Sequence, residues 1–530
     1  MILRCKHLVR NYTACIVLAG FGVHAHAQTS GLPWIGTWGV GQVDASDSLP
    51  STGENGLIFN QQTVRQIVHT SIGGSTARVQ FSNEYGTTPL TIADVHIAQR
   101  SSGSSTVSGT DRAITFAGAT SVTIAPGARI VSDGVAFTVM PGSDVAISTF
   151  YPAANAGMPL THVTLHPFTE QTSYFAAGDR SSQVSLSATE IGNYYFLTNL
   201  DVQNSAAAGA VVAFGASITD GDDSSGDTNH RWPNFLSQRF NAAGMNIGVI
   251  NKGISGAHLL SSAGFFGDSA ESRFSRDVLQ QPGVRWVILS DFPLNDVSDP
   301  SVTASSLIAG MQSLITQSHQ NHLKIFCSVL TPFKGSGGWT PQGEATRQQI
   351  NTFIRSGTSG CDGIIDQASV IQDPNDPEMI AAKFLGGPDD IHPNDAGYQA
   401  IANIVNLSLF APGLTAIQGP TACGVLRAGQ GIVPDQPLMS CDGRFMLFLQ
   451  DDGNLVIYEG NTPLWATGTV GAKSAQAVLE ANGNLVIYDS DGRPLWATNS
   501  DPADGATLSL GDDGTLVIRD ADGTVWTSTV

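Results

Sequence analysis

Between residues 206 and 412, short apolar runs alternate with stretches that have the spacing of helices. Five runs are predicted to be strands: residues 211–214, 247–250, 286–289, 325–329 and 363–365. Predicted helices lie at about 229–243, 302–317, 343–354 and 395–409. Such short apolar runs are typical of strands buried on both faces. The alternation therefore predicts an α/β domain with a parallel sheet covered by helices.

The first of these runs is followed at once by Gly215, Ala216 and Ser217, which predict a sharp turn before a helix. A serine at such a turn can expose its hydroxyl group at the edge of a sheet, where backbone N–H groups face an incoming anion. The pattern is not Gly-x-Ser-x-Gly, because Thr219 occupies the position of the last glycine. Taken alone, this stretch favours Ser217 as a helix N-cap.

Later loops of the same domain carry the other groups that ester cleavage needs. Gly256 follows the second predicted strand, Asn295 follows the third, and Asp389 and His392 precede the last helix. Loops at the carboxyl ends of parallel strands line one crevice, so these residues can meet. Ser217 would be the nucleophile, His392 its base and Asp389 the acid that orients the base. The N–H groups of Ser217 and Gly256 and the amide of Asn295 would bind the oxyanion.

Ser217, Gly256, Asn295 and His392, in this order, resemble the four namesake residues of the SGNH (GDSL-type) hydrolase family, and Asp389-x-x-His392-Pro393 resembles its last sequence block. The resemblance covers about residues 206–412 and implies an esterase. Two positions depart from the family pattern: Ala216 replaces an aspartate, and Pro293 replaces a glycine. These changes predict altered surroundings of Ser217 and an uncertain position of Asn295.

Residues 31–205 contain short alternating strands separated by turns rich in Gly, Ser, Asn and Asp, and predict a β-sandwich. His162 and His166 fall in one strand-like run, where a polar sandwich face is favoured over metal ligation. The loop after Ser217 is acidic but lacks the spacing of a calcium loop, and a solvated loop is predicted for its four aspartates, Asp220, Asp222, Asp223 and Asp227.

Beyond residue 420 the chain contains three related segments that end in Trp465, Trp496 and Trp526, spaced 31 and 30 residues apart. Each segment predicts two short strands joined by a turn that contains glycine. Neighbouring segments must pack together to bury the tryptophans, so an all-β repeat array is expected.

These repeats resemble bulb-type (monocot mannose-binding) lectins, whose sugar site reads Gln-x-Asp-x-Asn-x-Val-x-Tyr. The resemblance implies a β-prism-like fold and binding of mannose-type sugars. The first repeat matches the whole motif, with Gln450, Asp452, Asn454, Val456 and Tyr458. The second repeat departs at two positions and has Glu480, Asn482, Asn484, Val486 and Tyr488; the third has mostly lost the motif, with Gly511, Asp513, Thr515, Val517 and Arg519. One good sugar site is therefore expected, although the motif could also serve only the hairpin scaffold.

The start of the chain resembles a secretory signal. Arg4, Lys6 and Arg10 precede an apolar stretch, and Ala25-His26-Ala27 provides a cleavage site. The apolar stretch is too short to span a membrane, so no transmembrane segment is predicted. A secreted or periplasmic protein with four remaining cysteines is expected to form disulfides, and domain boundaries favour Cys327–Cys361 and Cys423–Cys441. The formal charge of −20 makes nucleic acid a poor partner.

The predicted organisation is a signal peptide at 1–27, a β-sandwich at 31–205, an SGNH hydrolase domain at 206–412, a linker at 413–420 and a lectin domain at 421–530. The expected function is a serine esterase that acts on a carbohydrate-linked ester such as an acetyl group, with no cofactor and no metal ion. Two alternatives stay open. One is a lipid acylhydrolase, for which Phe265 and Phe266 could line an acyl pocket, and the other is an adhesin with an inactive hydrolase domain.

Overall fold

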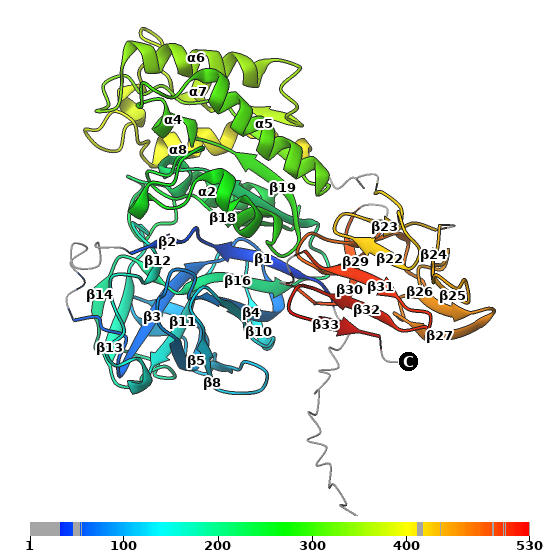
Figure 1. Ribbon diagram of the computed structural model, residues 1–530. Helices are drawn as coiled ribbons and strands as arrows, with labels where there is room; N and C mark the ends of the chain where they lie inside the picture. Colours follow the sequence, from blue (N-terminus) through cyan, green and yellow to red (C-terminus); the bar gives the residue numbers. More distant parts are fainter. Residues whose placement is uncertain are drawn as a thin grey trace, which may run out of the picture.

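A computed structural model describes residues 32–45, 54, 56–410, 417–434, 436–489, 492–501, 503 and 505–528. The predicted signal peptide and the first half of the predicted linker lie outside the described residues. Three regions pack side by side: a β-rich region, a helix-covered sheet and a second all-β region at the end of the chain (Figure 1). Within the described part of the chain, no helix is both long and apolar enough to cross a membrane.

The central region is built on a five-stranded sheet in the order β18-β17-β19-β20-β21, with every neighbouring pair parallel. Its strands are β17 (Gly209–Phe214), β18 (Ile247–Asn251), β19 (Val284–Leu289), β20 (Lys324–Ser328) and β21 (Gly363–Ile365). The predicted parallel sheet is confirmed. Because β17 lies between β18 and β19, where the order of the strands reverses, the loop that carries Ser217 opens at this switch point on the sheet's carboxyl edge.

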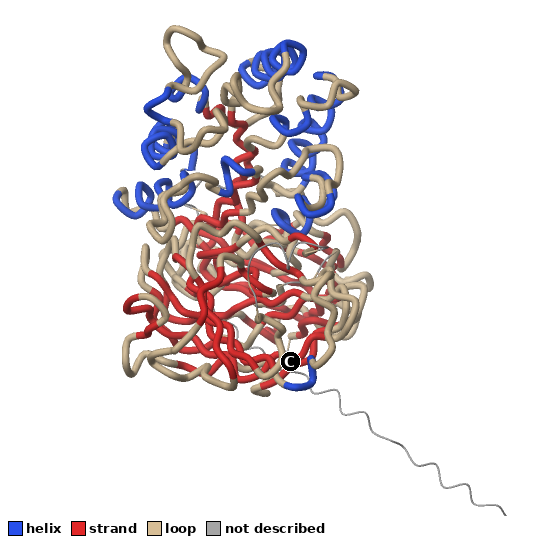
Figure 2. Tube along the Cα trace, turned by 90° about the vertical axis from the view of Figure 1, so that its left-hand side faces the viewer, coloured by secondary structure: helices blue, strands red, loops and turns tan. Residues whose placement is uncertain are grey.

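Helices cover both faces of this sheet, which Figure 2 shows nearly edge-on. The longer helices are α2 (Trp232–Ala242), α5 (Ala304–Gln320), α6 (Pro341–Arg355) and α8 (Asp395–Ile404). The short ones are α1 (Ser217–Asp220), α3 (Ala270–Phe274), α4 (Pro293–Asp296) and α7 (Gln367–Ile371). The last helix is shorter than predicted, because the chain turns after Val405 to bury Phe410 against the rings of Phe240, Trp286 and Phe326.

The N-terminal region consists mainly of two antiparallel sheets, ordered β1-β16-β4-β10 with β9 beside β4, and β14-β13-β3-β11-β5-β6 with β7 and β8 beside β5. The strands are β1 (Trp34–Gly39), β3 (Gln62–His69), β4 (Gly74–Ser82), β5 (Leu90–Ser102), β6 (Ser105–Thr106), β7 (Arg112–Ile114), β8 (Ser121–Ile124), β9 (Arg129–Val131), β10 (Val135–Val139), β11 (Asp144–Tyr151), β13 (Ser173–Ala177), β14 (Thr189–Ile191) and β16 (Leu197–Gln203). A small third sheet joins β2 (Val43–Asp44), β12 (Thr164–His166) and β15 (Tyr194–Tyr195).

The N-terminal and central regions share one hydrophobic core instead of each enclosing its own. Strand β1 lies against β18, and the Gly36 N–H donates to the Pro282 carbonyl at 3.0 Å. A Cβ atom at Gly248 would lie 2.2 Å from the Gly36 carbonyl oxygen, so only glycine permits this approach. The N-terminal region is therefore fixed against the sheet that carries the candidate active site.

The C-terminal region contains three four-stranded antiparallel sheets: β22-β31-β32-β33, β23-β28-β29-β30 and β24-β25-β26-β27. Its strands are β22 (Val425–Arg427), β23 (Gly431–Ile432), β24 (Leu438–Met439), β25 (Phe445–Leu449), β26 (Leu455–Glu459), β27 (Thr462–Ala466), β28 (Ser474–Leu479), β29 (Leu485–Asp489), β30 (Pro494–Ala497), β31 (Thr507–Leu510), β32 (Leu516–Arg519) and β33 (Thr524–Thr527). Each repeat thus supplies three strands, one more than predicted, and residues 425–439 supply the fourth strand of each sheet. The rings of Trp465, Trp496 and Trp526 meet edge to face, with centroids 5.9–6.4 Å apart.

Both predicted disulfides are present. Cys327, in β20, is bonded to Cys361 just before β21, and Cys423 is bonded to Cys441. The first bond closes a loop around α6 and the second joins the ends of the segment that supplies β22, β23 and β24. Each bond lies within one region of the chain.

Candidate active site and lectin motifs

Ser217 is the first residue of α1, which follows strand β17 of the central region. The carboxylate of Asp291, which follows β19, accepts hydrogen bonds from the Ile218 N–H at 2.9 Å and from the Thr219 hydroxyl at 2.5 Å. A Cβ atom at Gly215 would lie 2.3 Å from the same carboxylate, so glycine is needed there. Asp291 therefore ties the serine turn to the neighbouring strand. Our sequence analysis did not identify it, although its position at a strand end was visible.

His392 lies between Ser217 and Asp389. Its Nε2 is 2.8 Å from the Ser217 hydroxyl oxygen, and its Nδ1 is hydrogen-bonded to the Asp389 carboxylate. The other carboxylate oxygen of Asp389 accepts from the backbone N–H groups of Ile391 and His392, at 3.1 and 3.2 Å. These contacts, together with the charge interaction with His392, lower the pKa of Asp389 although partial burial opposes the shift. The geometry is that of a nucleophile, a base and an orienting carboxylate.

Three groups at this site can donate hydrogen bonds to an oxygen atom bound beside Ser217. Among the described residues, none accepts a hydrogen bond from the backbone N–H of Ser217 or Gly256. The amide of Asn295 gives one N–H to the Ala257 carbonyl at 2.8 Å, which orients the side chain and leaves a second N–H. Pro293 begins α4 and does not prevent Asn295 from reaching the cleft.

The cleft around these residues has a volume of about 460 Å³ and is open to solvent. It is lined by all five predicted site residues of the hydrolase region: Ser217, Gly256, Asn295, Asp389 and His392. One part of its lining is apolar and consists of Phe168, Phe266, Leu294, Phe333 and Ile391. The side chains of the site therefore face a space large enough for a small ester and part of its two substituents.

Phe168 and Phe266 form the exposed side of this apolar lining. They are 47 % and 45 % exposed, and both rings contact that of Phe265, with centroids 5.9 Å away in each case. Phe168 comes from the N-terminal region and has a left-handed backbone, with φ of 55°. The ring of Phe266 occupies the place where Gly256 would carry a side chain, since a Cβ atom there would lie 2.3 Å from it. Nothing in the sequence signalled the role of Phe168.

Asp220 is buried and Asp222 is half-buried, which contradicts the expectation of a solvated acidic loop for these two residues, whereas Asp223 and Asp227 are exposed as expected. The Ser255 hydroxyl lies 2.6 Å from Asp222 Oδ1 and 3.0 Å from Asp220 Oδ2. One hydroxyl proton cannot serve two carboxylates, so the arrangement favours a proton on Asp222. Burial, followed by the charge of Asp220, raises the pKa of Asp222 to about 7. Asp222 Oδ2 lies 3.9 Å from His392 Nε2.

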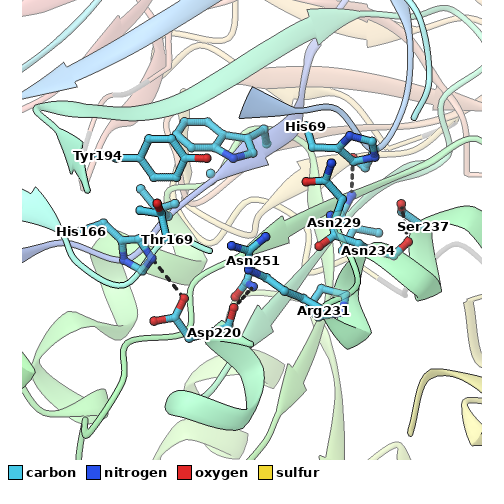
Figure 3. Close-up of a pocket in the computed structure, with 16 residues that line it drawn as sticks. His69, His166, Thr169, Tyr194, Asp220, Asn229, Arg231, Asn234, Ser237 and Asn251 are labelled. Atoms are coloured by element: carbon cyan, nitrogen blue, oxygen red, sulfur yellow. Dashed lines mark hydrogen bonds and ion pairs between the residues drawn. The ribbon is translucent and has the colours of Figure 1, made fainter. Parts of the chain in front are cut away.

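His166 is also placed differently from the predicted polar face of a sandwich. It is buried, and its Nε2 lies 3.1 Å from the Asp220 carboxylate of the central region (Figure 3). His162, by contrast, is largely exposed and lies 3.0 Å from Asp44. His166 thus connects the N-terminal region to the loop behind Ser217.

Figure 3 shows a second cavity, which is lined by His166 and Asp220 and by side chains that include Tyr194 and Arg231. Its volume of about 50 Å³ is enough for a few water molecules and too small for a sugar ester. The open cleft is therefore the better candidate for substrate binding.

Asp223, Asp389 and His392 are the described residues whose ligand atoms come close enough together to hold a metal ion. Both ring nitrogens of His392 already have partners, Asp389 and Ser217. A metal ion at this cluster would have to displace one of these contacts, so the arrangement fits proton transfer better than metal binding.

In the first lectin repeat, Gln450 and Tyr458 are half-buried and Asp452 is exposed. Gln450 Nε2 donates to the Tyr458 hydroxyl at 2.8 Å, and Asp452 accepts from the Asn454 backbone N–H at 3.0 Å. The carbonyl oxygen of the buried Asn454 side chain accepts from Thr467 Oγ1 and from two backbone N–H groups. Asn454 therefore supports the hairpin, and the other polar members can face a ligand; Val456 is buried.

The second repeat has the same internal contacts in a buried setting. The Tyr488 hydroxyl donates to Glu480, and Asn482 accepts from the Asn484 N–H at 3.0 Å. Tyr488, Asn482 and Asn484 are 6 %, 2 % and 2 % exposed. In the third repeat, Asp513 and Arg519 are exposed. Of the three motifs, the first is both complete and open.

Comparison with known proteins finds two kinds of similarity in this chain. Residues 213–400 match the family model of GDSL-like lipases and acylhydrolases. The B-type lectin plumieribetin of Scorpaena plumieri is 43 % identical over 56 residues, which are 11 % of this chain and 49 % of that protein. A mannose-specific lectin of Narcissus pseudonarcissus is 35 % identical over 65 residues, which are 12 % of this chain and 58 % of that protein. The chain thus spans about half the length of the curated relatives it matches.

Among solved structures, a lipolytic protein of the G-D-S-L family from Desulfitobacterium hafniense is 22 % identical, with 37 % of this chain and 96 % of that chain covered and a TM-score of 0.29. Residues 213–400 of the central region thus match the GDSL-like lipases and acylhydrolases, and the chain also contains a segment similar to mannose-specific lectins.

Proposed function

We propose that this chain is a secreted or periplasmic serine esterase with a glycan-binding module. The observation that carries the proposal is the hydrogen-bonded series Ser217–His392–Asp389, which opens into a cleft of about 460 Å³. The match of residues 213–400 to GDSL-like lipases and acylhydrolases supports a hydrolase independently of this geometry.

In the proposed reaction, His392 Nε2 takes the proton of Ser217 while the serine oxygen attacks the ester carbonyl carbon. Asp389 holds the Nδ1–H and stabilises the positive imidazolium ring. The negative carbonyl oxygen accepts hydrogen bonds from the N–H groups of Ser217 and Gly256 and from the Asn295 amide. The imidazolium then protonates the departing alcohol, and a water molecule activated by His392 releases the acid from Ser217.

A carbohydrate-linked ester, such as an acetylated sugar, is the proposed substrate. The lectin homology supports it, because a module that holds a glycan raises the local concentration of any ester attached to that glycan. The open cleft supports it as well, since an extended glycan can leave the site on the solvent side. Mannose-type sugars are the proposed ligands of the first lectin repeat.

A second candidate is an acylhydrolase for longer apolar acyl groups. Phe168 and Phe266 favour it, since these two exposed rings both contact Phe265 and form an apolar patch beside the cleft. Phe266 contacts Gly256 on the oxyanion side, which is where the acyl group of a bound ester would lie. The left-handed backbone of Phe168 adds a conformational cost that a binding role would explain.

The third candidate is a glycan-binding protein with an inactive hydrolase domain, for which Ala216 and Pro293 are the arguments. Against it, the Asp291 carboxylate supports the serine turn without an aspartate at position 216, and Asn295 lines the cleft despite Pro293. We therefore rank the active enzyme first.

A series of p-nitrophenyl esters from acetyl to dodecanoyl separates the three candidates. We would measure kcat/KM for wild type, Ser217→Ala, Phe168→Ala and a control, Ser408→Ala. Ser408 is exposed and does not line the cleft. A loss of activity of at least a thousandfold in Ser217→Ala would support a serine esterase. If Phe168→Ala lowers activity about tenfold on octanoyl and not on acetyl esters, the apolar acyl group is the substrate feature recognised. Absence of activity in wild type on these esters and on acetylated glycans would support the inactive domain.

A further inference from the structure

The polar motif of the second lectin repeat faces the central region of the same chain. Glu480, Asn482 and Tyr488 line a narrow cavity of about 50 Å³ together with Arg285 and His322, which come from β19 and from the turn before β20. The first repeat's Tyr458 is half-buried, whereas Tyr488 is 6 % exposed. A monosaccharide cannot reach the second motif while this arrangement persists.

Arg285 makes the principal contact across this interface. Its guanidinium carbon lies 4.9 Å from the centroid of the Tyr488 ring, and Nη1 donates to the Gly492 carbonyl. Both ends of the Arg285 side chain lie against glycine residues. A Cβ atom at Gly209 would lie 2.6 Å from Arg285 Cδ, and one at Gly492 would lie 2.6 Å from Nη1. The arginine is thus packed along its length between the two regions.

The two departures of the second repeat from the sugar motif are explained by this position. Glu480, in place of Gln, accepts from the Tyr488 hydroxyl; burial raises its pKa to about 7, and the charge of Arg285 opposes this shift only in part. Asn482, in place of Asp, is 2 % exposed, whereas the corresponding Asp452 of the first repeat is exposed. A second carboxylate beside Glu480 would add an uncompensated buried charge, and the neutral amide avoids it.

Two further contacts connect the C-terminal region to the rest of the chain. His322 lies over Gly429, where a Cβ atom would be 2.7 Å from the imidazole Cδ2. The Asp501 carboxylate pairs with Arg78 of the N-terminal region, which also binds Asp201 at 3.0 Å; all three side chains are buried. The C-terminal region therefore packs against both other regions of the chain.

We infer that the second lectin repeat is an intramolecular docking surface for the central region and does not act as a second sugar site. Its motif residues contact Arg285 in place of a sugar. The consequence is a fixed direction from the open first repeat to the cleft at Ser217, so that glycans are bound at a defined position relative to the reacting ester. The inference depends on contacts of the C-terminal region and stands whether or not the central region is an active enzyme.

The test uses the full chain and two variants of the interface, Arg285→Ala and the double variant Arg285→Ala/Asp501→Asn. Arg427→Ala is the matched control, since Arg427 is exposed on the C-terminal region. Small-angle scattering and calorimetry are measured on each protein, and near-UV circular dichroism checks that the aromatic cores remain folded. We expect wild type and the control to unfold in one coupled transition. The double variant should show an increased radius of gyration and a separate, earlier transition.

Titration of the same proteins with mannose provides an independent readout. Wild type should bind at most one sugar per C-terminal region, and opening the interface should not lower the occupancy of the first repeat. Two equal mannose sites in the intact wild-type chain would overturn the inference. An unchanged radius of gyration and a single unchanged transition in the folded double variant would overturn it as well.

Discussion

The hydroxyl oxygen of Ser217 lies 2.8 Å from Nε2 of His392, although 175 positions separate the two residues in the chain. The contact forms because β17 ends at the carboxyl edge of the sheet, between β18 and β19, and the loop before α8 returns to the same edge. The His392 ring is held from its other side by Asp389, three residues earlier on that loop. A base fixed in this way can take a proton from Ser217 without first reorienting.

Asp389→Asn is expected to lower kcat by about ten-thousandfold, because an amide at this position favours the wrong tautomer of the histidine. The matched control is Asp390→Asn, which removes the same charge from the adjacent residue. Asn tolerates the left-handed backbone that Asp390 has, with φ of 58°. Steady-state kinetics on p-nitrophenyl acetate measures both. Similar losses in the two variants would indicate a general charge effect and would contradict the orienting role.

Asn295→Ala is expected to reduce kcat by about a hundredfold with little change in KM, since an oxyanion donor acts mainly in the transition state. The side chain is otherwise held by one hydrogen bond to the Ala257 carbonyl, so folding should be maintained. Kinetics on a small soluble ester, with thermal unfolding as a check, measures the effect. A variant with full kcat would remove Asn295 from the proposed oxyanion site.

Tyr458→Phe is expected to weaken mannose binding about tenfold, because it removes a hydroxyl group that can contact the ligand and is positioned by Gln450. It is a cleaner probe than Asn454→Ala, since the Asn454 carbonyl oxygen holds the turn at residues 467–469 and its loss would disturb the hairpin. Tyr488→Phe, in the covered second repeat, is the control and should leave mannose binding unchanged. Calorimetric titration would measure all three proteins; equal effects of the two tyrosines would contradict a single site.

Glu480→Gln is expected to change the pH dependence of stability. Burial raises the pKa of Glu480 from 4.5 to about 7, so the folded chain favours the neutral acid. Stability from this group is fully present below pH 4.5 and is lost as the pH rises through 7. The difference in Tm between variant and wild type should therefore shift in favour of the variant from pH 4.5 to pH 8. Other carboxyl groups are common to both proteins and cancel, so a constant difference across this range would show that Glu480 is not held neutral.

Much of the central region could be predicted because its signals are local. Apolar runs bounded by turns identified all five strands of the sheet, and the rule for parallel sheets brought Ser217, Gly256, Asn295, Asp389 and His392 to one edge. The structure brings these residues together around the cleft. The order of the strands was not predictable from those runs, since each run is equally apolar on both faces.

Contacts between regions escaped prediction for a different reason. Phe168, His166 and Arg285 belong to different elements and have no local pattern that sets them apart from structural residues. Their roles depend on which surface lies opposite them. The burial of Asp220, in the acidic loop after Ser217, was missed for the same reason, because its carboxylate contacts His166 from another region.

The sequence by itself determined the composition of each region: a parallel sheet from buried apolar runs, three β-repeats from recurring tryptophans, and two disulfides within the regions. These features follow from periodicity and short-range chemistry, which are written into consecutive residues. Only the tertiary structure decided that the N-terminal and central regions share one core and that the second lectin motif is covered while the first is open. Those outcomes depend on shape and charge complementarity between surfaces distant in sequence, such as Arg285 with Tyr488 and Gly492, and no single segment encodes them.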